Sequence, residues 1–201
     1  MSDNYITIST VKEVQSPEEL GKKILKWLQA KEIIENELSD CILSTKKKGY
    51  KPANKHIDAI GYDENILRLQ VCGLEVKTER EVFNAGAFTP FTKLECPNCN
   101  TNRFKGITPQ DFYTENCTEE QLNRFNTVFL EFDKWSNNEK ASLNCPYCST
   151  ESNLSSYKTD NSIAFSNLGF TFWNWPDLKE EFLIELKTEI GMDIIRMNGH
   201  L

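Results

Sequence analysis

Two short stretches decide the interpretation of this chain: Leu94-Glu95-Cys96-Pro97-Asn98-Cys99-Asn100 and Leu143-Asn144-Cys145-Pro146-Tyr147-Cys148-Ser149. In each stretch two residues separate a pair of cysteines, and a proline follows the first cysteine. A turn with this spacing lets both sulfur atoms bend toward one ion, and two such turns supply four thiolates to a tetrahedral shell. The sequence therefore predicts a structural Zn²⁺ site at Cys96, Cys99, Cys145 and Cys148.

These two stretches resemble the knuckles of zinc-ribbon proteins. The resemblance covers the two stretches alone, and about 45 residues with their own helical pattern separate them, a length that loop-closure entropy tolerates. Zinc ribbons usually have glycine after the second cysteine, where this chain has Asn100 and Ser149. Asparagine adopts a left-handed backbone more readily than serine does. The resemblance implies a zinc ribbon interrupted by a helical insertion.

Other metals and other thiol chemistry are the alternatives for these cysteines. Four thiolates also suit iron, so spacing alone leaves the metal open. Cys145-Pro146-Tyr147-Cys148 matches the redox motif of glutaredoxins, whose first cysteine lies at a helix N-terminus that lowers its pKa. The residues from 149 to 156 lack a helical apolar period, which argues against redox chemistry. The lone cysteines Cys41, Cys72 and Cys117 are expected to be small buried hydrophobic residues.

Recognisable catalytic chemistry is missing from the sequence. Four cysteines close the zinc shell, whereas a catalytic zinc keeps an open position for water. His56 and His200 lie in no known motif, and the sequence contains no phosphate-binding glycine loop, nucleophile elbow or metalloprotease helix. We therefore expect a protein that is not an enzyme, with no catalytic residues and no organic cofactor.

Composition restricts the possible partners. The chain has 201 residues, a formal net charge of −7 and 39% hydrophobic residues, enough for a buried core. Binding held mainly by a phosphate backbone needs clustered Lys and Arg, so the acidic charge of the chain argues against nucleic acid as its partner. No apolar run approaches the ~20 residues of a membrane span. The first residues lack the features of a signal peptide, so a cytoplasmic location is expected.

The periodicity predicts an α+β fold, with a mixed or antiparallel sheet and about three helices. Expected helices begin at Pro17 (with Ser16 and Glu19 as a capping box), after Thr118 (with Gln121 as its partner) and at Pro176. In the second helix, Leu122, Phe125, Phe129 and Phe132 share the apolar face. Expected strands cover Tyr5–Val11, two segments within Asn65–Asn84 divided at Gly73, Phe88–Leu94, Phe170–Trp175 and Met192–Met197.

Three segments are expected in the domain organisation. Residues 1–93 form an N-terminal α/β part, in which Glu32–Tyr62 is irregular, and residues 94–150 hold the zinc ribbon with its insertion. Residues 151–201 form a strand, a helix and a strand that pack with the N-terminal part. The aromatic run Phe170–Trp175 is expected to be mainly core. An exposed Trp173–Trp175 face would instead mark a partner surface.

The favoured function is protein binding by a rigid, zinc-stabilised scaffold. An acidic surface complements a basic partner and speeds their association. In size and charge the chain is similar to small acidic bacterial immunity proteins, which neutralise secreted toxins, many of them basic nucleases. The alternative is a zinc-ribbon protein associated with nucleic acid or regulation, which would use a lysine cluster that otherwise forms a solvated loop. That cluster comprises Lys46, Lys47, Lys48, Lys51 and Lys55.

Overall fold

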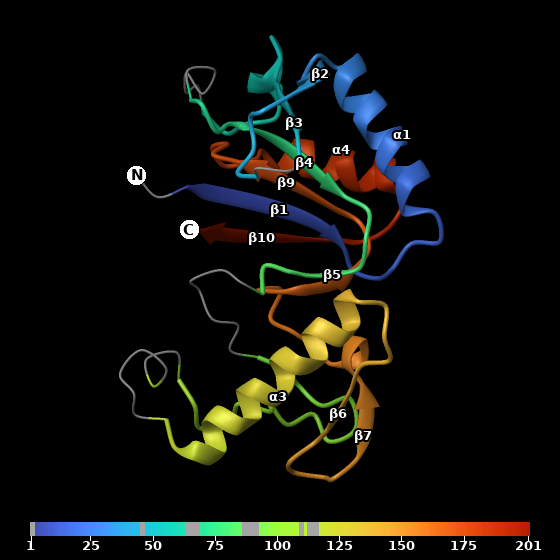
Figure 1. Cartoon of the computed structure of the whole chain (residues 1–201). Coiled ribbons are helices and arrows are strands. Elements are labelled where there is room, and N and C mark those ends of the chain that lie inside the picture. Colours follow the sequence, from blue (N-terminus) through green and yellow to red (C-terminus); the bar gives the residue numbers. More distant parts are fainter. Residues whose placement is uncertain (1–2, 45–46, 63–68, 86–92, 109–110, 112–116) are drawn as a thin grey trace. The chain divides into compact units, whose positions relative to one another are not determined.

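The computed structural model describes residues 3–44, 47–62, 69–85, 93–108, 111 and 117–201. The chain divides into two compact units, one formed by Met1–Glu79 with Ser166–Leu201 and the other by Arg80–Phe165. The strands and helices of the described residues give an α+β fold with antiparallel sheets, as predicted. We call these parts unit 1 and unit 2. Figure 1 shows the elements of each.

Unit 1 is built on a six-stranded sheet with the order β10-β1-β9-β4-β3-β2, in which every neighbouring pair is antiparallel. Its strands are β1 (Asn4–Thr10), β2 (Ile34–Ser39), β3 (Gly49–Pro52), β4 (Gly73–Lys77), β9 (Gly169–Trp173) and β10 (Ile194–His200). The first strand of the chain lies between two of the last strands, so both ends of the sequence contribute to one sheet (Figure 1).

Helices α1 (Pro17–Ala30) and α4 (Glu180–Ile190) share the hydrophobic core of unit 1 with the sheet. Ile8, Phe170 and Phe172 alternate with polar neighbours along β1 and β9 and are at most 1% exposed. Each such side chain contributes about 1.5–3 kcal/mol through burial. This unit also contains a short 3₁₀ helix, η1 (His56–Asp58).

The opposite residues of the same strands form a buried polar row. Thr7 of β1 is paired with Thr171 of β9, which is paired in turn with Glu75 of β4. The two threonine hydroxyls are 2.9 Å apart, and Nε1 of Trp173 donates to Oε2 of Glu75 at 3.0 Å. These bonds offset the cost of burying the polar groups.

Among its described residues, unit 2 has a long helix and short strands. It contains α3 (Glu119–Ser136), the hairpin of β6 (Ser142–Asn144) and β7 (Glu151–Asn153), and the 3₁₀ helix η3 (Leu154–Ser156). Its strand β5 (Glu81–Phe83) pairs with β8 (Ala164–Ser166), whose last residue, Ser166, belongs to unit 1. Thr118 and Gln121 form the predicted capping box at the start of α3. Phe125, Phe132 and Trp135 of this helix lie in a core that also includes Cys96 and Cys145.

Several predictions of local structure are wrong. Ser16 precedes α1 but makes no side-chain capping bond. The segment expected to be irregular contains β2, whose side chains are mostly exposed, and β3, in which only Lys51 is exposed, and neither strand shows a clear alternation. Pro176 does not open a helix, because Leu178 forms a β-bridge with Ile60 and α4 begins only at Glu180.

Two further corrections concern single residues. Gly73 begins β4 instead of interrupting a strand, and a Cβ atom there would collide with Sγ of Cys41. Phe129 is 44% exposed, while Val128 is fully buried, so the buried face of α3 is rotated from the predicted one. Ile66, Leu67, Lys46 and most of the predicted strand Phe88–Leu94 lie outside the described residues.

Candidate metal centre

The first cysteine pair forms a tight turn held by backbone hydrogen bonds. The amide of Cys96 donates to the carbonyl of Thr101 at 3.0 Å, and the amide of Asn100 donates back to the carbonyl of Cys96 at 2.9 Å. The amide of Asn98 points at Sγ of Cys96 from 3.4 Å. Asn100 has φ of 53°, a left-handed conformation that reverses the chain. The turn therefore directs both side chains of the pair to the same side.

The second pair repeats this geometry. The amide of Cys145 donates to the carbonyl of Thr150 at 3.0 Å, and the amide of Ser149 donates to the carbonyl of Cys145 at 2.9 Å. Ser149 has φ of 57°, so it occupies the position of Asn100 in the first turn. This turn is the tip of the β6–β7 hairpin, in which Asn144 pairs with Glu151. Two equivalent turns thus carry the four cysteines.

The structure brings all four sulfur atoms together, with every pair within 4.8 Å. Sγ of Cys96 lies 3.8 Å from Sγ of Cys148, and Sγ of Cys99 lies 3.7 Å from Sγ of Cys145. A zinc ion with Zn–S bonds of about 2.3 Å holds its thiolates about 3.8 Å apart in a tetrahedron. A disulfide needs a separation of about 2.05 Å, and all four are free cysteines. The spacing fits one tetrahedral metal ion.

Local hydrogen bonds and burial shift the thiol pKa values in opposite directions. The hydroxyl and the backbone amide of Thr150 lower the pKa of Cys148 to about 6. Thr101 has the same relation to Cys99 and lowers the pKa of that thiol. Burial raises the pKa of Cys145 to about 11. Cys148 is thus prepared as the thiolate that binds metals, the pKa of Cys99 is shifted in the same direction, and Cys145 must give up a proton to bind.

Arg103 is a buried cation beside this cluster that the sequence analysis did not identify. Its side chain is 6% exposed, and Nη1 donates to the carbonyl of Asn144, next to Cys145, at 2.7 Å. Burial lowers the pKa of Arg103, and interactions with Tyr157 and Cys145 act in the opposite direction. A divalent ion held by four thiolates has a net negative charge, which a nearby guanidinium compensates. The only signal in the sequence is a basic residue soon after the first turn.

The second turn lacks the geometry of a redox cysteine. Cys145 follows strand β6, and the residues after Cys148 enter strand β7 and then η3. Among the described residues no helix begins at Cys145 to stabilise its thiolate, and burial raises its pKa. The structure contradicts the glutaredoxin alternative on this point.

The other candidate residues are not members of the sulfur cluster. His56, expected in a loop, is in η1, where Nδ1 lies 2.7 Å from the carbonyl of Ala53 and the ring meets Trp175 edge-on. His200 ends β10. Trp173 and Trp175 are 8% and 4% exposed, so the aromatic run is core and offers no tryptophan face to a partner.

The described lysines of the predicted cluster are exposed, and the lone cysteines are buried or half-buried. Lys47, Lys48, Lys51 and Lys55 are exposed, and Lys55 forms an ion pair with Glu32 at 3.3 Å. Cys41 and Cys72 are buried as expected, and burial raises the pKa of Cys72 to about 12. Cys117 is half-buried and is not part of the sulfur cluster.

Comparisons with known proteins identify no family for this chain. A scan against protein-family models, a search of curated proteins and a search of solved structures each found no match to the chain. Among the helices in the described ranges, none combines the length and the apolar character that a bilayer crossing requires.

Proposed function

We propose that this chain is a metal-binding protein in which Cys96, Cys99, Cys145 and Cys148 hold one structural Zn²⁺ ion. The observation that carries the proposal is the set of sulfur separations, 3.7–3.8 Å for two pairs and below 4.8 Å for all. Zinc would link the two equivalent turns, which lie about 45 residues apart in sequence, and the pattern supports the zinc-ribbon interpretation. The closed ligand set favours a structural role.

Zinc and iron can be distinguished by direct reconstitution. We expect the reduced protein to bind one Zn²⁺ tightly and to remain colourless, and Co²⁺ to take the same place in a tetrahedral thiolate environment with a visible absorption spectrum. Replacement of Cys99 by Ser should abolish this cobalt spectrum, while Cys72→Ser, a change in the core of unit 1, should leave it unchanged. A protein that instead purifies with iron would contradict the zinc assignment.

We propose further that the protein acts by binding another protein with a basic surface, in the manner of an immunity protein that neutralises a basic toxin. The support is the net charge of −7, which favours association with a positively charged partner. This part concerns the partner, and the metal site does not depend on it.

Growth rescue tests the proposed partner. Proteins retained by the immobilised zinc-loaded chain at low salt and released by added salt would first be identified. We expect a basic protein that slows growth when produced alone and permits growth when co-produced with this chain. Retained proteins that are acidic, or a basic one whose effect on growth this chain does not relieve, would contradict the proposal.

A further inference from the structure

Arg103 is a buried cation that connects the two cysteine turns of unit 2. Its backbone amide donates to the carbonyl of Leu94 at 2.9 Å, which ties the residue to the segment that leads into the first turn. Its side chain is 6% exposed and reaches the second turn, where Nη1 donates to the carbonyl of Asn144 at 2.7 Å. Arg103 is therefore held at both ends, and its guanidinium binds the residue that precedes Cys145.

The guanidinium of Arg103 lacks a negative partner in the part of the chain that the structure describes. No described Asp or Glu forms an ion pair with it, and its Nε is buried without a hydrogen-bond partner. The ionisable groups that interact with its charge include Tyr157, whose hydroxyl is ordinarily neutral at pH 7, the thiol of Cys145, and Arg124, which repels it. A buried charge without a counter-charge is strongly destabilising.

The position of strand β6 does not explain why this donor is charged. Three side chains bind three successive residues of the strand. Glu131 accepts from the amide of Ser142 at 2.9 Å, and the hydroxyl of Tyr157 donates to the carbonyl of Leu143 at 3.1 Å. Arg103 binds the next carbonyl along the strand. A neutral hydroxyl is thus sufficient to hold one carbonyl of β6, and the positive charge of Arg103 needs another explanation.

An occupied metal site would supply the missing counter-charge. Four thiolates outweigh a divalent ion, so the occupied site is negative. We propose that Arg103 is the counter-ion of the occupied site and that its burial is favourable only while metal is bound. This proposal rests on the four-cysteine zinc site proposed above. Two effects of opposite sign follow: the charge of Arg103 raises the affinity for zinc, and the same charge destabilises zinc-free unit 2.

Competition with a zinc chelator of known affinity, on the reduced full chain at one fixed pH, tests the first effect. Arg103→Met keeps the length of the side chain without its charge and should bind zinc about 10-fold to 100-fold more weakly. Arg103→Lys keeps the charge and should recover most of the affinity. Tyr157→Phe is the matched control, because it removes a neutral donor from the neighbouring carbonyl of β6. It should weaken zinc binding clearly less than Arg103→Met does.

The reduction potential of iron placed in the same site separates charge from structure. Reduced iron leaves a four-thiolate site more negative than oxidised iron does, so a nearby cation favours the reduced state. In the chain reconstituted with iron, Arg103→Met should shift the potential to more negative values by about 60 mV, which corresponds to a tenfold change in equilibrium. Arg103→Lys and Tyr157→Phe should keep a potential close to that of the wild type, because neither removes a charge.

Amide hydrogen exchange in α3 tests the second effect. With zinc bound, exchange should be faster in Arg103→Met than in the wild type, because the occupied site has lost its counter-ion. After a chelator removes the zinc, this difference should vanish or reverse, because Met buries no charge.

Two results would overturn this proposal while the metal site stands. They are an Arg103→Met variant that binds zinc as tightly as the wild type, and an iron potential that this change does not move. Faster exchange of zinc-free Arg103→Met than of the zinc-free wild type would contradict the second effect, since it would show that Arg103 stabilises unit 2 without metal. A wild-type chain that binds no zinc would instead contradict the metal site itself, so the two failures are distinguishable.

Discussion

Cys148 and Cys145 differ in how readily they give up a proton, and this difference predicts how zinc affinity depends on pH. Cys148, with a pKa of about 6, is half ionised at that pH and largely a thiolate at pH 7, whereas Cys145, with a pKa of about 11, releases a proton on binding metal. Apparent zinc affinity should therefore rise at least about tenfold per pH unit between pH 6 and 8. Below pH 6 the dependence should steepen by about a further tenfold per unit, because Cys148 then also competes with protons.

Competition with a coloured zinc chelator of known affinity, measured from pH 5 to pH 8, checks this prediction. An affinity that does not change over this range would show that protons and zinc do not compete for these thiols.

Trp173 and Trp175 are both buried, but only one of them has a hydrogen-bonding role. Nε1 of Trp173 donates to Glu75 at 3.0 Å, while Nε1 of Trp175 has no partner among the described residues. Replacement by Phe removes similar volume at either position. Trp173→Phe also leaves a buried carboxylate without its donor, so it should cost about 1–3 kcal/mol more of the free energy of unfolding than Trp175→Phe. Urea unfolding followed by circular dichroism measures both, and equal losses would contradict the role of Glu75.

Some residues of the candidate site were identifiable from the sequence and others were not. The four cysteines stand out through their spacing, and the left-handed turns were expected at Asn100 and Ser149 from the position that glycine usually occupies. Arg103 gives no comparable signal, because a single arginine is usually exposed. Its burial depends on strand β6, which is distant in sequence and contributes the carbonyl of Asn144.

At the scale of elements, the two helix starts with similar sequence signals should respond differently to mutation. Thr118 accepts a hydrogen bond from the amide of Gln121 at 3.3 Å, and the side chain of Gln121 accepts one from the amide of Thr118 at 2.8 Å. Ser16 has the same sequence spacing to Glu19 but no side-chain capping bond. Thr118→Ala should therefore lower stability by about 1 kcal/mol, and Ser16→Ala by clearly less. Thermal unfolding of the two variants checks this, and equal effects would contradict the larger contribution expected from the capping box in α3.

Helices were easier to predict than strands for a physical reason. The apolar period of α1 and α3 is local and survives in the sequence, so both were expected near their observed positions. Strand β2 has mostly exposed side chains and exists through its pairing with β3, which leaves no period to detect. The start of α4 is set by the bridge between Leu178 and Ile60, a tertiary contact that the sequence pattern of Pro176 does not reveal.

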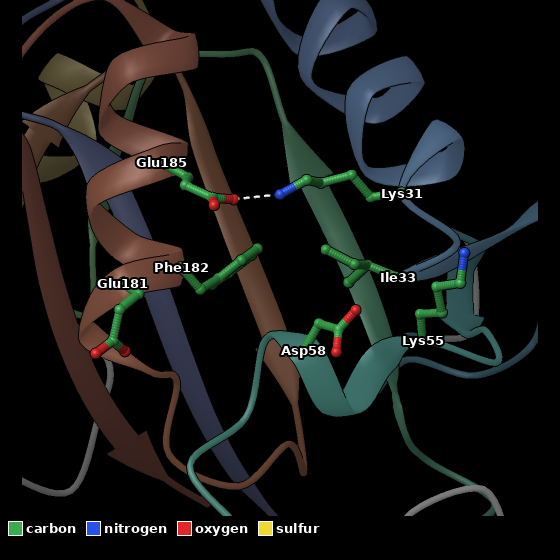
Figure 2. A pocket seen from close by; sticks show the side chains of 7 residues that line it. All are labelled: Lys31, Ile33, Lys55, Asp58, Glu181, Phe182 and Glu185. Atoms are coloured by element: carbon green, nitrogen blue, oxygen red, sulfur yellow. Dashed lines mark hydrogen bonds and ion pairs between the residues drawn. The ribbon is translucent and has the colours of Figure 1, made fainter.

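At the scale of the whole molecule, sequence could not give the strand order. Thr7 and Thr171 lie 164 residues apart and meet in neighbouring strands. Pairing over such a distance depends on the complete set of competing strands rather than on the pattern of either one. A pocket lined by Lys31, Asp58 and Glu185, among other residues, arises in the same way, because the end of α1, η1 and α4 contribute to it from distant parts of the chain (Figure 2).

Removal of the metal should affect the two units unequally. Cys96 and Cys145 belong to the hydrophobic core of unit 2, while the core of unit 1 contains none of the four clustered cysteines. A strong chelator should therefore broaden or shift the amide resonances of α3, β6 and β7 and leave most of those of the six-stranded sheet in place. Added zinc should restore the original spectrum. Resonances of unit 2 that remain unchanged after complete zinc removal would contradict a structural role for the ion.

The most direct test of the proposed four-cysteine zinc site is the metal content of the purified protein. It is determined by elemental analysis for the wild type and two cysteine variants. We predict about one zinc ion per chain in the wild type and in Cys117→Ser, a control that alters a cysteine of unit 2 outside the cluster. Cys96→Ser should retain far less than one. A wild-type protein without bound metal, or a Cys96→Ser variant with the full amount, would contradict the central claim.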